Sequence, residues 1–227
     1  AQHYSMGGID VDATCASPVE GFFAAGECAC VSVHGANRLG GNSLLESIVF
    51  GRIAGESASL YLRGGHSEVG GGRDVAERAR ALTARIRAVH ERETGENVFQ
   101  LLNRLKRLMS DAAGIFREPT TLRKGIEELA VLREAYRRVF IYGNCGRYCQ
   151  EMVVLVEFEH MVEVAEVILL GALKREETRG SHFRKDFPKR DDASWLKHTI
   201  ITRSDKGPVI TYRDVQIGRY APQERIY

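Results

Sequence analysis

The thirteen residues from His34 to Glu46 constrain the fold of this chain more than any other stretch. They read His-Gly-Ala-Asn-Arg-Leu-Gly-Gly-Asn-Ser-Leu-Leu-Glu. Gly40 and Gly41 allow the backbone to approach a bound group where a Cβ atom would collide. Ser43 and Glu46 have the S-x-x-E spacing of a capping box, in which both side chains bond to backbone N–H groups where a helix starts. The stretch therefore predicts a loop that turns into a helix, with the positive helix end facing an anionic ligand.

Two side chains that can carry positive charge are the first candidates for ligand binding. Arg38 lies within this stretch, and His3 lies near the start of the chain. A guanidinium stays charged and binds a carboxylate through two parallel hydrogen bonds. Spacing alone favours structural roles, in which Arg38 pairs with a nearby carboxylate and His3 is a turn residue whose hydrogen bonds are satisfied. The motifs around them, described below, reverse that judgement.

Composition excludes several classes of protein. The chain has 227 residues, 44% of them hydrophobic, and a net charge of +2, so it can bury a core and carries no strong nucleic-acid footprint. Its five cysteines lack the spacing of a zinc site, and we expect buried, reduced thiols. We expect no signal peptide at the start of the sequence. The most apolar stretch, 152–173, contains too many charged residues to span a bilayer.

Hydrophobic periodicity predicts an α/β segment followed by helices. Residues 9–12 alternate as in a half-exposed strand, and residues 22–25 form a short apolar run typical of a buried strand. A glycine-rich linker is expected at 64–72. Helices are predicted at residues 43–62, 75–89, 98–109, 122–139 and 151–174. The last four are expected to form an antiparallel bundle of three or four members. Strands at 195–202 and 209–215, joined by a turn at 204–208, complete the prediction.

Several motifs together resemble the flavoprotein subunit of succinate dehydrogenase and fumarate reductase. They are His3-Tyr4-Ser5-Met6-Gly7-Gly8-Ile9, then Gly21-Phe22-Phe23-Ala24-Ala25-Gly26-Glu27-Cys28, then the stretch from His34 to Glu46, then Arg179-Gly180-Ser181-His182, Asp186-Phe187-Pro188-Lys189-Arg190-Asp191-Asp192 and Trp195-Leu196-Lys197-His198-Thr199. The resemblance covers almost the whole chain but only the C-terminal portion of that family. It implies an α/β remnant of an FAD-binding domain (1–63), an antiparallel helical bundle (73–174) and a small α+β C-terminal domain with a strand pair (175–227).

The resemblance also assigns roles to particular residues. It implies that His3 and Arg38 bind the carboxylates of a C4 dicarboxylate, succinate or fumarate, above the flavin. Glu27, after Gly26, corresponds to the acidic residue that binds a hydroxyl of FAD. Ser43 and Leu44 match the helix start whose N–H groups face the flavin pyrimidine edge.

Three other positions keep open or structural interpretations. His34 either orients Arg38 or the flavin, or is simply a packed imidazole. His182, with Arg179, is expected to be structural or to face another subunit. Asp191 and Asp192 are expected to lie on a solvated surface.

The reaction implied by the resemblance is hydride transfer between FAD and the dicarboxylate, with electrons exchanged with an iron–sulfur subunit. The protein would be cytoplasmic and peripheral on the inner face of the membrane, held there by partner subunits. The chain contains no G-x-G-x-x-G fingerprint. The flavin-binding N-terminal half of the family is therefore missing from it, and we expect the chain alone to be inactive.

Two alternatives remain open. The first is a fragment of L-aspartate oxidase, which shares the His-Gly-Ala-Asn-Arg core but usually departs from Gly40-Gly41 and lacks the Arg190-Asp191-Asp192 and Trp195 pattern. The second is a non-catalytic module in which residues 73–227 pack on partner subunits. Binding of FAD by the chain would favour a functional site over a docking module.

Overall fold

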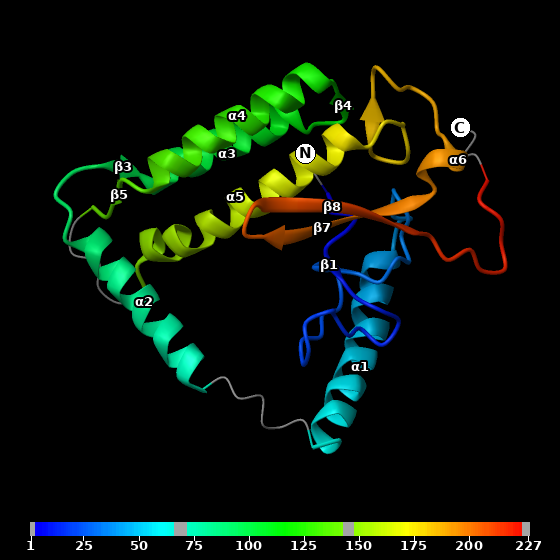
Figure 1. Ribbon diagram of the computed structural model, residues 1–227, viewed down its shortest axis with the longest axis horizontal. Helices are drawn as coiled ribbons and strands as arrows, with labels where there is room; N and C mark the ends of the chain where they lie inside the picture. The colour runs from blue at the N-terminus through cyan, green and yellow to red at the C-terminus, as the bar shows by residue number, and fades with distance from the viewer. Residues whose placement is uncertain (1–2, 66–71, 143–147, 224–227) are drawn as a thin grey trace. The chain divides into compact units, whose positions relative to one another are not determined.

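The computed structural model describes residues 3–65, 72–142 and 148–223 of the chain, and it divides into two compact units (Figure 1). The first unit is Ala1–Thr83 and the second is Ala84–Tyr227. Helix α2 (Gly72–His90) spans the boundary between them. Each unit has a hydrophobic cluster of its own. The division into 1–63, 73–174 and 175–227 stays a prediction.

The first unit is built on two short parallel strands. β1 (Ile9–Asp10) pairs with β2 (Ala29–Cys30), and Ile9 lies opposite Ala29. Gly8, with φ +151°, makes this pairing possible, because a Cβ there would lie 2.4 Å from the carbonyl oxygen of Cys28. The small cluster beside these strands consists of Val11, Ala24 and Ala29, with Ile9 and Val31 packed against it. The chain around residue 8 is thereby held close to the chain around residue 28.

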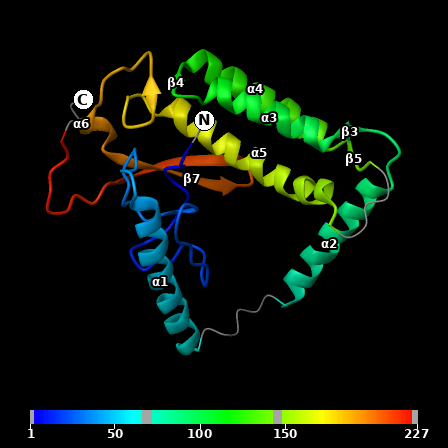
Figure 2. The same cartoon turned by 180° about the vertical axis from the view of Figure 1, so that it is seen from behind.

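Helix α1 (Asn42–Arg63) packs against the loop between β1 and β2, and Figure 2 shows it from behind. The thiol of the fully buried Cys15 contacts the carbonyl oxygen of Phe50 at 3.4 Å. The rings of Phe23 and Tyr61 meet edge to face, with centroids 6.0 Å apart. α1 is therefore fixed to the loop at two levels along its length.

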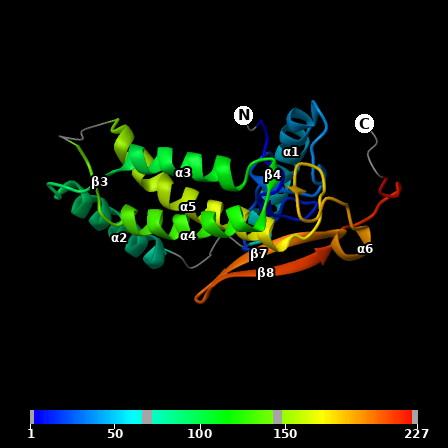
Figure 3. The same cartoon turned by 90° about the horizontal axis from the view of Figure 1, so that it is seen from above.

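The second unit is centred on three helices: α3 (Val98–Ala112), α4 (Pro119–Tyr136) and α5 (Gln150–Lys174). They pack on one another as neighbours, alternating in direction, as Figures 1 and 3 show. Asn97 caps α3 by accepting hydrogen bonds from the N–H groups of Phe99 and Gln100. The core includes the fully buried residues Leu101, Leu122, Leu129, Leu132, Phe158 and Leu169. The predicted antiparallel bundle is present in these three helices.

Short parallel pairs flank the bundle. β3 (Glu96–Asn97) pairs with β5 (Val139–Phe140), and β4 (Phe116–Arg117) pairs with β6 (Phe183–Arg184). β7 (Lys197–Ser204) and β8 (Gly207–Asp214) form an antiparallel hairpin after the short helix α6 (Asp192–Trp195). The predicted hairpin is thus confirmed.

Some sequence predictions about this fold are wrong. Residues 22–25 form no strand; only Phe23 makes an isolated bridge, to Ala16, because glycines with positive φ at positions 21 and 26 bend the chain on both sides. The first hairpin strand starts at Lys197, two residues later than expected, because Asp191 caps α6 and keeps Trp195 helical.

The apolar stripe predicted for α2 is mostly not buried. The side chain of Val75 is 66% exposed, and only Val89 joins the core of the bundle. α2 forms as a helix without packing its whole length, because a helical period sets where apolar residues point but not what covers them.

Two further observations concern the cysteines and the helices. Cys149 is disulfide-bonded, so the expectation of reduced thiols is wrong for this residue. Cys15 carries a buried free thiol, as expected, whereas the free thiol of Cys28 belongs to an exposed residue, so the expectation of burial is wrong there. Within the described ranges, no helix is long and apolar enough to cross a membrane.

Candidate dicarboxylate and flavin site

In the first unit, the side chains of Tyr4 and His34 both contact one carboxylate oxygen of Glu46. The hydroxyl of Tyr4 donates to Oε2 of Glu46 at 2.5 Å, and Nε2 of His34 lies 2.7 Å from the same oxygen. The rings of Tyr4 and His34 also pack edge to face, with centroids 5.5 Å apart. Glu46 is only 4% exposed. Burial, the hydrogen bond to Glu46 and its negative charge raise the pKa of Tyr4 to about 12.

Arg38 rests on this cluster. Its guanidinium carbon lies 4.4 Å from the centroid of the Tyr4 ring, within the range of a cation–π interaction. Nη1 of Arg38 donates to the carbonyl oxygen of Leu39 at 3.2 Å. Its Nε is buried and has no hydrogen-bond partner among the described residues, and Nδ1 of His34 is in the same situation. Buried polar atoms are almost always paired, so these two nitrogens indicate a site that the described chain does not complete by itself.

The predicted capping box is wrong. α1 begins at Asn42 after Gly41, whose φ is +84°, and no side chain caps this end. Glu46 does not reach back to the backbone, because its carboxylate is buried and already accepts from Tyr4 and faces His34. The S-x-x-E spacing describes a local option, and contacts with residues far along the chain outweigh it here.

The uncapped helix end suits an acceptor group on a ligand. The first N–H groups of any helix lack partners within it, and α1 has neither a side-chain cap nor an acidic residue in its first turn. Ser43 and Leu44 lie in that turn, and the side chain of Leu44 is 72% exposed. Their expected role at the flavin pyrimidine edge is compatible with this geometry and stays a prediction.

Gly26 and Glu27 connect the N-terminal segment to α1. A Cβ on the buried Gly26, whose φ is +80°, would lie 3.2 Å from Oγ of Ser47. Oε1 of the exposed Glu27 accepts a hydrogen bond from the backbone N–H of Ser5 at 3.0 Å. A glycine is therefore required where the loop passes α1. The role of Glu27 toward FAD stays a prediction.

His3 is exposed and directly precedes Tyr4, on whose ring the Arg38 guanidinium lies. The structure therefore brings the segment that carries His3 to the segment that carries Arg38. The joint binding of one ligand by the two side chains stays a prediction. Within the described residues, no group of three or more His, Cys, Asp or Glu side chains is arranged to hold a metal ion.

Sequence reasoning missed Tyr4 and Glu46 as members of this site. The spacing of Glu46 from Phe50, Ile53 and Tyr61 is that of residues on one face of a helix, and this spacing was a signal in the sequence. In the structure this is the inward face of α1: Glu46 is buried and the other three residues are partly buried. The apolar residues Leu44 and Ile48 lie outside this inward face and are 72% and 70% exposed in this chain.

A second polar cluster lies in the second unit. Glu177 is fully buried and accepts hydrogen bonds from Arg175, from Arg179 at 2.7 and 2.9 Å, and from the N–H of Asp191 at 3.1 Å. Burial, with nearby arginines, lowers the pKa of His182 to about 4, which fits the structural role expected of it. Asp192 is exposed, as expected, and it also forms ion pairs with Arg179 and Arg190.

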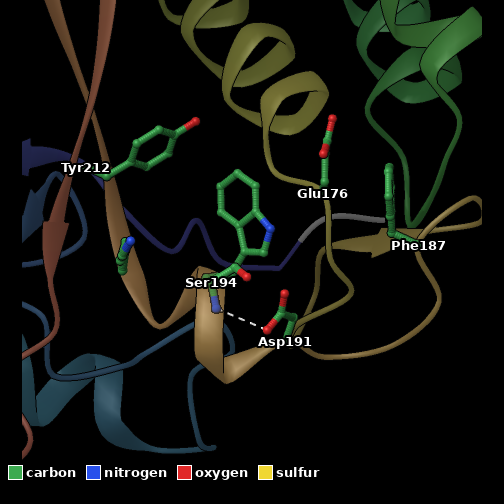
Figure 4. A pocket seen from close by; sticks show the side chains of 7 residues that line it. Glu176, Phe187, Asp191, Ser194 and Tyr212 are labelled. Carbon is green, nitrogen blue, oxygen red and sulfur yellow. Dashed lines mark hydrogen bonds between the residues drawn. The ribbon is translucent and has the colours of Figure 1, made fainter.

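The second unit also has an open cavity of about 500 Å³ between the end of α5 and the hairpin (Figure 4). Its walls include Tyr212 of β8, Phe187 and Glu176. Ser194 and Asp191 also line it, and the backbone N–H of Ser194 donates a hydrogen bond to Oδ1 of Asp191. None of the predicted site residues lines this cavity.

Comparison with known proteins gives two family matches. Residues 102–227 match the family described as fumarate reductase flavoprotein C-term, and residues 1–44 match the FAD binding domain family. The first match covers more than half of the chain. The second contains all the residues expected above to bind FAD or substrate, namely His3, Gly26, Glu27, Arg38, Ser43 and Leu44, and it agrees with FAD as the cofactor.

Similar proteins carry consistent names. The chain is 40% identical over 230 residues to the fumarate reductase flavoprotein subunit of Mycobacterium tuberculosis, and 36% identical over 226 residues to that of Haemophilus influenzae; each match covers 99% of this chain. The solved FrdA chain of Escherichia coli quinol fumarate reductase superposes with a TM-score of 0.89 at 36% identity, over 99% of this chain.

The chain spans only part of these relatives. It covers 39% of the M. tuberculosis subunit, 37% of the H. influenzae subunit and 39% of the solved E. coli chain. The chain contains both a segment that matches the FAD binding domain family and the family's C-terminal region. On this evidence the chain belongs to the fumarate reductase flavoprotein C-terminal family, joined to a segment of an FAD-binding domain.

Proposed function

We propose that this chain forms the carboxylate-binding side of a flavoprotein site that interconverts succinate and fumarate. The observation that carries the proposal is the placement of Arg38, whose guanidinium lies on the Tyr4 ring and whose buried Nε has no partner in the described chain. A carboxylate is the ligand that a guanidinium binds best, through charge-assisted bonds. The names of the similar proteins, fumarate reductase and succinate dehydrogenase flavoprotein subunits, supply the substrate class.

Each residue has a distinct task in this proposal. Arg38 binds and orients one carboxylate of the dicarboxylate, and His3 donates to the other. Holding both ends of the substrate fixes its central carbons, which replaces a random encounter with a positioned one. The guanidinium of Arg38 lies against the Tyr4 ring, and Glu46 beneath that ring is buried, so part of the surroundings of Arg38 is protein rather than water, which strengthens its attraction for a carboxylate.

The same unit has groups that fit FAD. Glu27 would bind a hydroxyl of the cofactor, and the N–H groups of Ser43 and Leu44 at the uncapped start of α1 would face its pyrimidine edge. The positive helix end favours negative charge there by about 1 kcal/mol. When bound, FAD supplies the acceptor or donor of the hydride.

The chain needs partners to perform this function. The remaining N-terminal part of the flavoprotein would complete the cofactor site, and an iron–sulfur subunit would exchange electrons with it. Such partners would also place the complex on the cytoplasmic face of a membrane. We therefore expect no fumarate reduction by the 227-residue chain alone.

A hybrid protein tests the proposal. The chain replaces the matching C-terminal part of the E. coli fumarate reductase flavoprotein subunit, to which it is 37% identical over 230 residues. Fumarate reduction by the purified hybrid is then measured with a reduced viologen dye, after the FAD content has been determined from absorbance. We expect turnover by the hybrid, and a loss of kcat/KM of roughly 100-fold or more in Arg38→Ala, because a charged donor that positions the substrate is removed.

The control is Arg52→Ala, which removes an exposed guanidinium on α1 that is paired with Glu56. It should leave the kinetic parameters unchanged. An FAD-loaded hybrid that reduces no fumarate would contradict the proposal, and so would an Arg38→Ala hybrid with parental activity. L-Aspartate oxidation, assayed in parallel, tests the alternative enzyme.

The exposed apolar residues of α1 favour a second candidate function, a docking module without catalysis. Leu44, Leu45 and Ile48 are 60–72% exposed in this chain. If docking were the only role, the hybrid would assemble and fold without binding FAD. Flavin absorbance in the purified hybrid therefore separates the two functions.

A further inference from the structure

We infer that Tyr4 and Glu46 are positioning residues that set the orientation of the Arg38 guanidinium for its carboxylate. The inference rests on the proposed function of Arg38 and extends it to two side chains that need not touch the substrate. It starts from a geometric observation: Arg38 has only one hydrogen bond within the described residues, to the neighbouring Leu39 carbonyl. That bond leaves the guanidinium free to turn unless something else holds its plane.

The Tyr4 ring provides that support. The Arg38 guanidinium carbon lies 4.4 Å from its centroid, so the ring defines the surface on which the guanidinium lies. A ring can only do this if it is itself fixed. The Tyr4 hydroxyl is anchored by its 2.5 Å hydrogen bond to Glu46, which lies 42 residues away on α1.

Glu46 is in turn held in one position. α1 carries it, and the helix is fixed to the loop through Cys15 and Phe50, four residues further along. Nε2 of His34 lies 2.7 Å from the same Glu46 oxygen. A buried carboxylate that receives two donors on one oxygen has little freedom to rotate. The chain of contacts therefore runs from the helix through Glu46 and Tyr4 to Arg38.

The two unpartnered nitrogens agree with this arrangement. Nδ1 of His34 and Nε of Arg38 are both buried and without a hydrogen-bond partner in the described chain. Such atoms cost free energy, which indicates that packing rather than hydrogen bonding fixes Arg38 before a ligand arrives. A ligand that pairs with these nitrogens would offset that cost, as is usual for preorganised binding groups.

The first test uses the isolated full chain and does not depend on its activity. Phenylglyoxal modifies accessible guanidinium groups, and mass spectrometry of peptides measures the rate at each arginine. Arg52, whose side chain is 81% exposed, serves as an internal reference. We expect Arg38 to react more slowly than Arg52 in the parent, and about tenfold faster in Tyr4→Leu than in the parent. Glu46→Gln should give a smaller increase, and Tyr4→Phe should too, because it keeps the ring.

Tyr61→Phe is a matched control. Tyr61 also donates to a glutamate, Glu20, at 3.1 Å and also packs edge to face, on Phe23, but it supports no arginine of the site. Its rate profile should equal that of the parent. Circular dichroism establishes that each variant is folded. Equal Arg38 rates in the parent, Tyr4→Leu and Glu46→Gln would overturn the inference.

The second test measures consequences for substrate in the FAD-loaded hybrid. Tyr4→Leu and Glu46→Gln should raise the KM for fumarate about tenfold, with FAD content and flavin absorbance unchanged. Tyr61→Phe should not change KM. A KM within twofold of the parent in both site variants would overturn the inference. If the parent hybrid itself reduces no fumarate, the proposed function fails, and the modification rates alone decide whether Tyr4 and Glu46 hold Arg38.

Discussion

Replacement of the buried Glu177 should weaken the second unit by a large, calculable amount. Its carboxylate accepts from Arg175 and from Arg179, whose side chains are only 15% and 17% exposed. Breaking a buried ion pair by removing one partner typically costs about 3–5 kcal/mol, because the remaining charge stays buried without compensation. Arg179 keeps its 2.7 Å bond to Asp192, and Arg175 keeps its bond to the Trp195 carbonyl. We therefore expect the lower end, about 3 kcal/mol for Glu177→Gln.

Urea unfolding followed by fluorescence measures this loss. Trp195 is the single tryptophan of the chain, and Arg175 lies over its ring, so the signal reports on this cluster. The control is Glu134→Gln, which breaks an exposed pair with Arg137 and should change the free energy of unfolding by less than about 0.5 kcal/mol. A loss below about 1 kcal/mol for Glu177→Gln would refute the argument that the cluster depends on this charge.

Three further predictions concern packing and titration. Gly125→Ala should lower the melting temperature, because the new Cβ would lie 2.7 Å from the Cβ of Ala112 on α3. Gly171→Ala should raise the melting temperature through the gain in helix propensity, because the nearest atom to its new Cβ, in Ile201, would be 3.7 Å away. The unfolded chain protonates His182 near pH 6.5 but the folded one only near 4, so stability should fall as the pH drops through this window, and His182→Asn should flatten the urea profile there. Tyr4, with its pKa of about 12, should stay protonated near pH 11, and Glu46→Gln should bring its ionisation closer to that of ordinary tyrosines in ultraviolet titration.

The helices illustrate what a sequence pattern predicts well. The expected helix at 151–174 is observed at Gln150–Lys174, and the expected helix at 43–62 at Asn42–Arg63. Both follow from a period that any chain segment carries by itself. Short strands were harder to place: the strand expected at 22–25 is not formed, and Ala29–Cys30 pairs with β1 instead, since pairing depends on which distant segment lies alongside.

The candidate site divides in the same way. The sequence by itself was sufficient to indicate Arg38, Glu27 and the helix start at Ser43 as candidates, because their residue types and their neighbours form recognisable motifs. It could not indicate that Arg38 rests on the Tyr4 ring. That contact joins positions 34 residues apart, and no local pattern records it.

Glu46 shows the physical reason most clearly. Its spacing from Ser43 is that of a capping box, and an isolated helix would have every reason to use it so. In the folded chain, Tyr4 and His34 arrive from 42 and 12 residues away and occupy the carboxylate instead. Local sequence determined that a helix starts here and that an arginine precedes it. Only tertiary contacts decided that the glutamate turns inward, because burial and distant hydrogen-bond donors outweigh a local backbone bond.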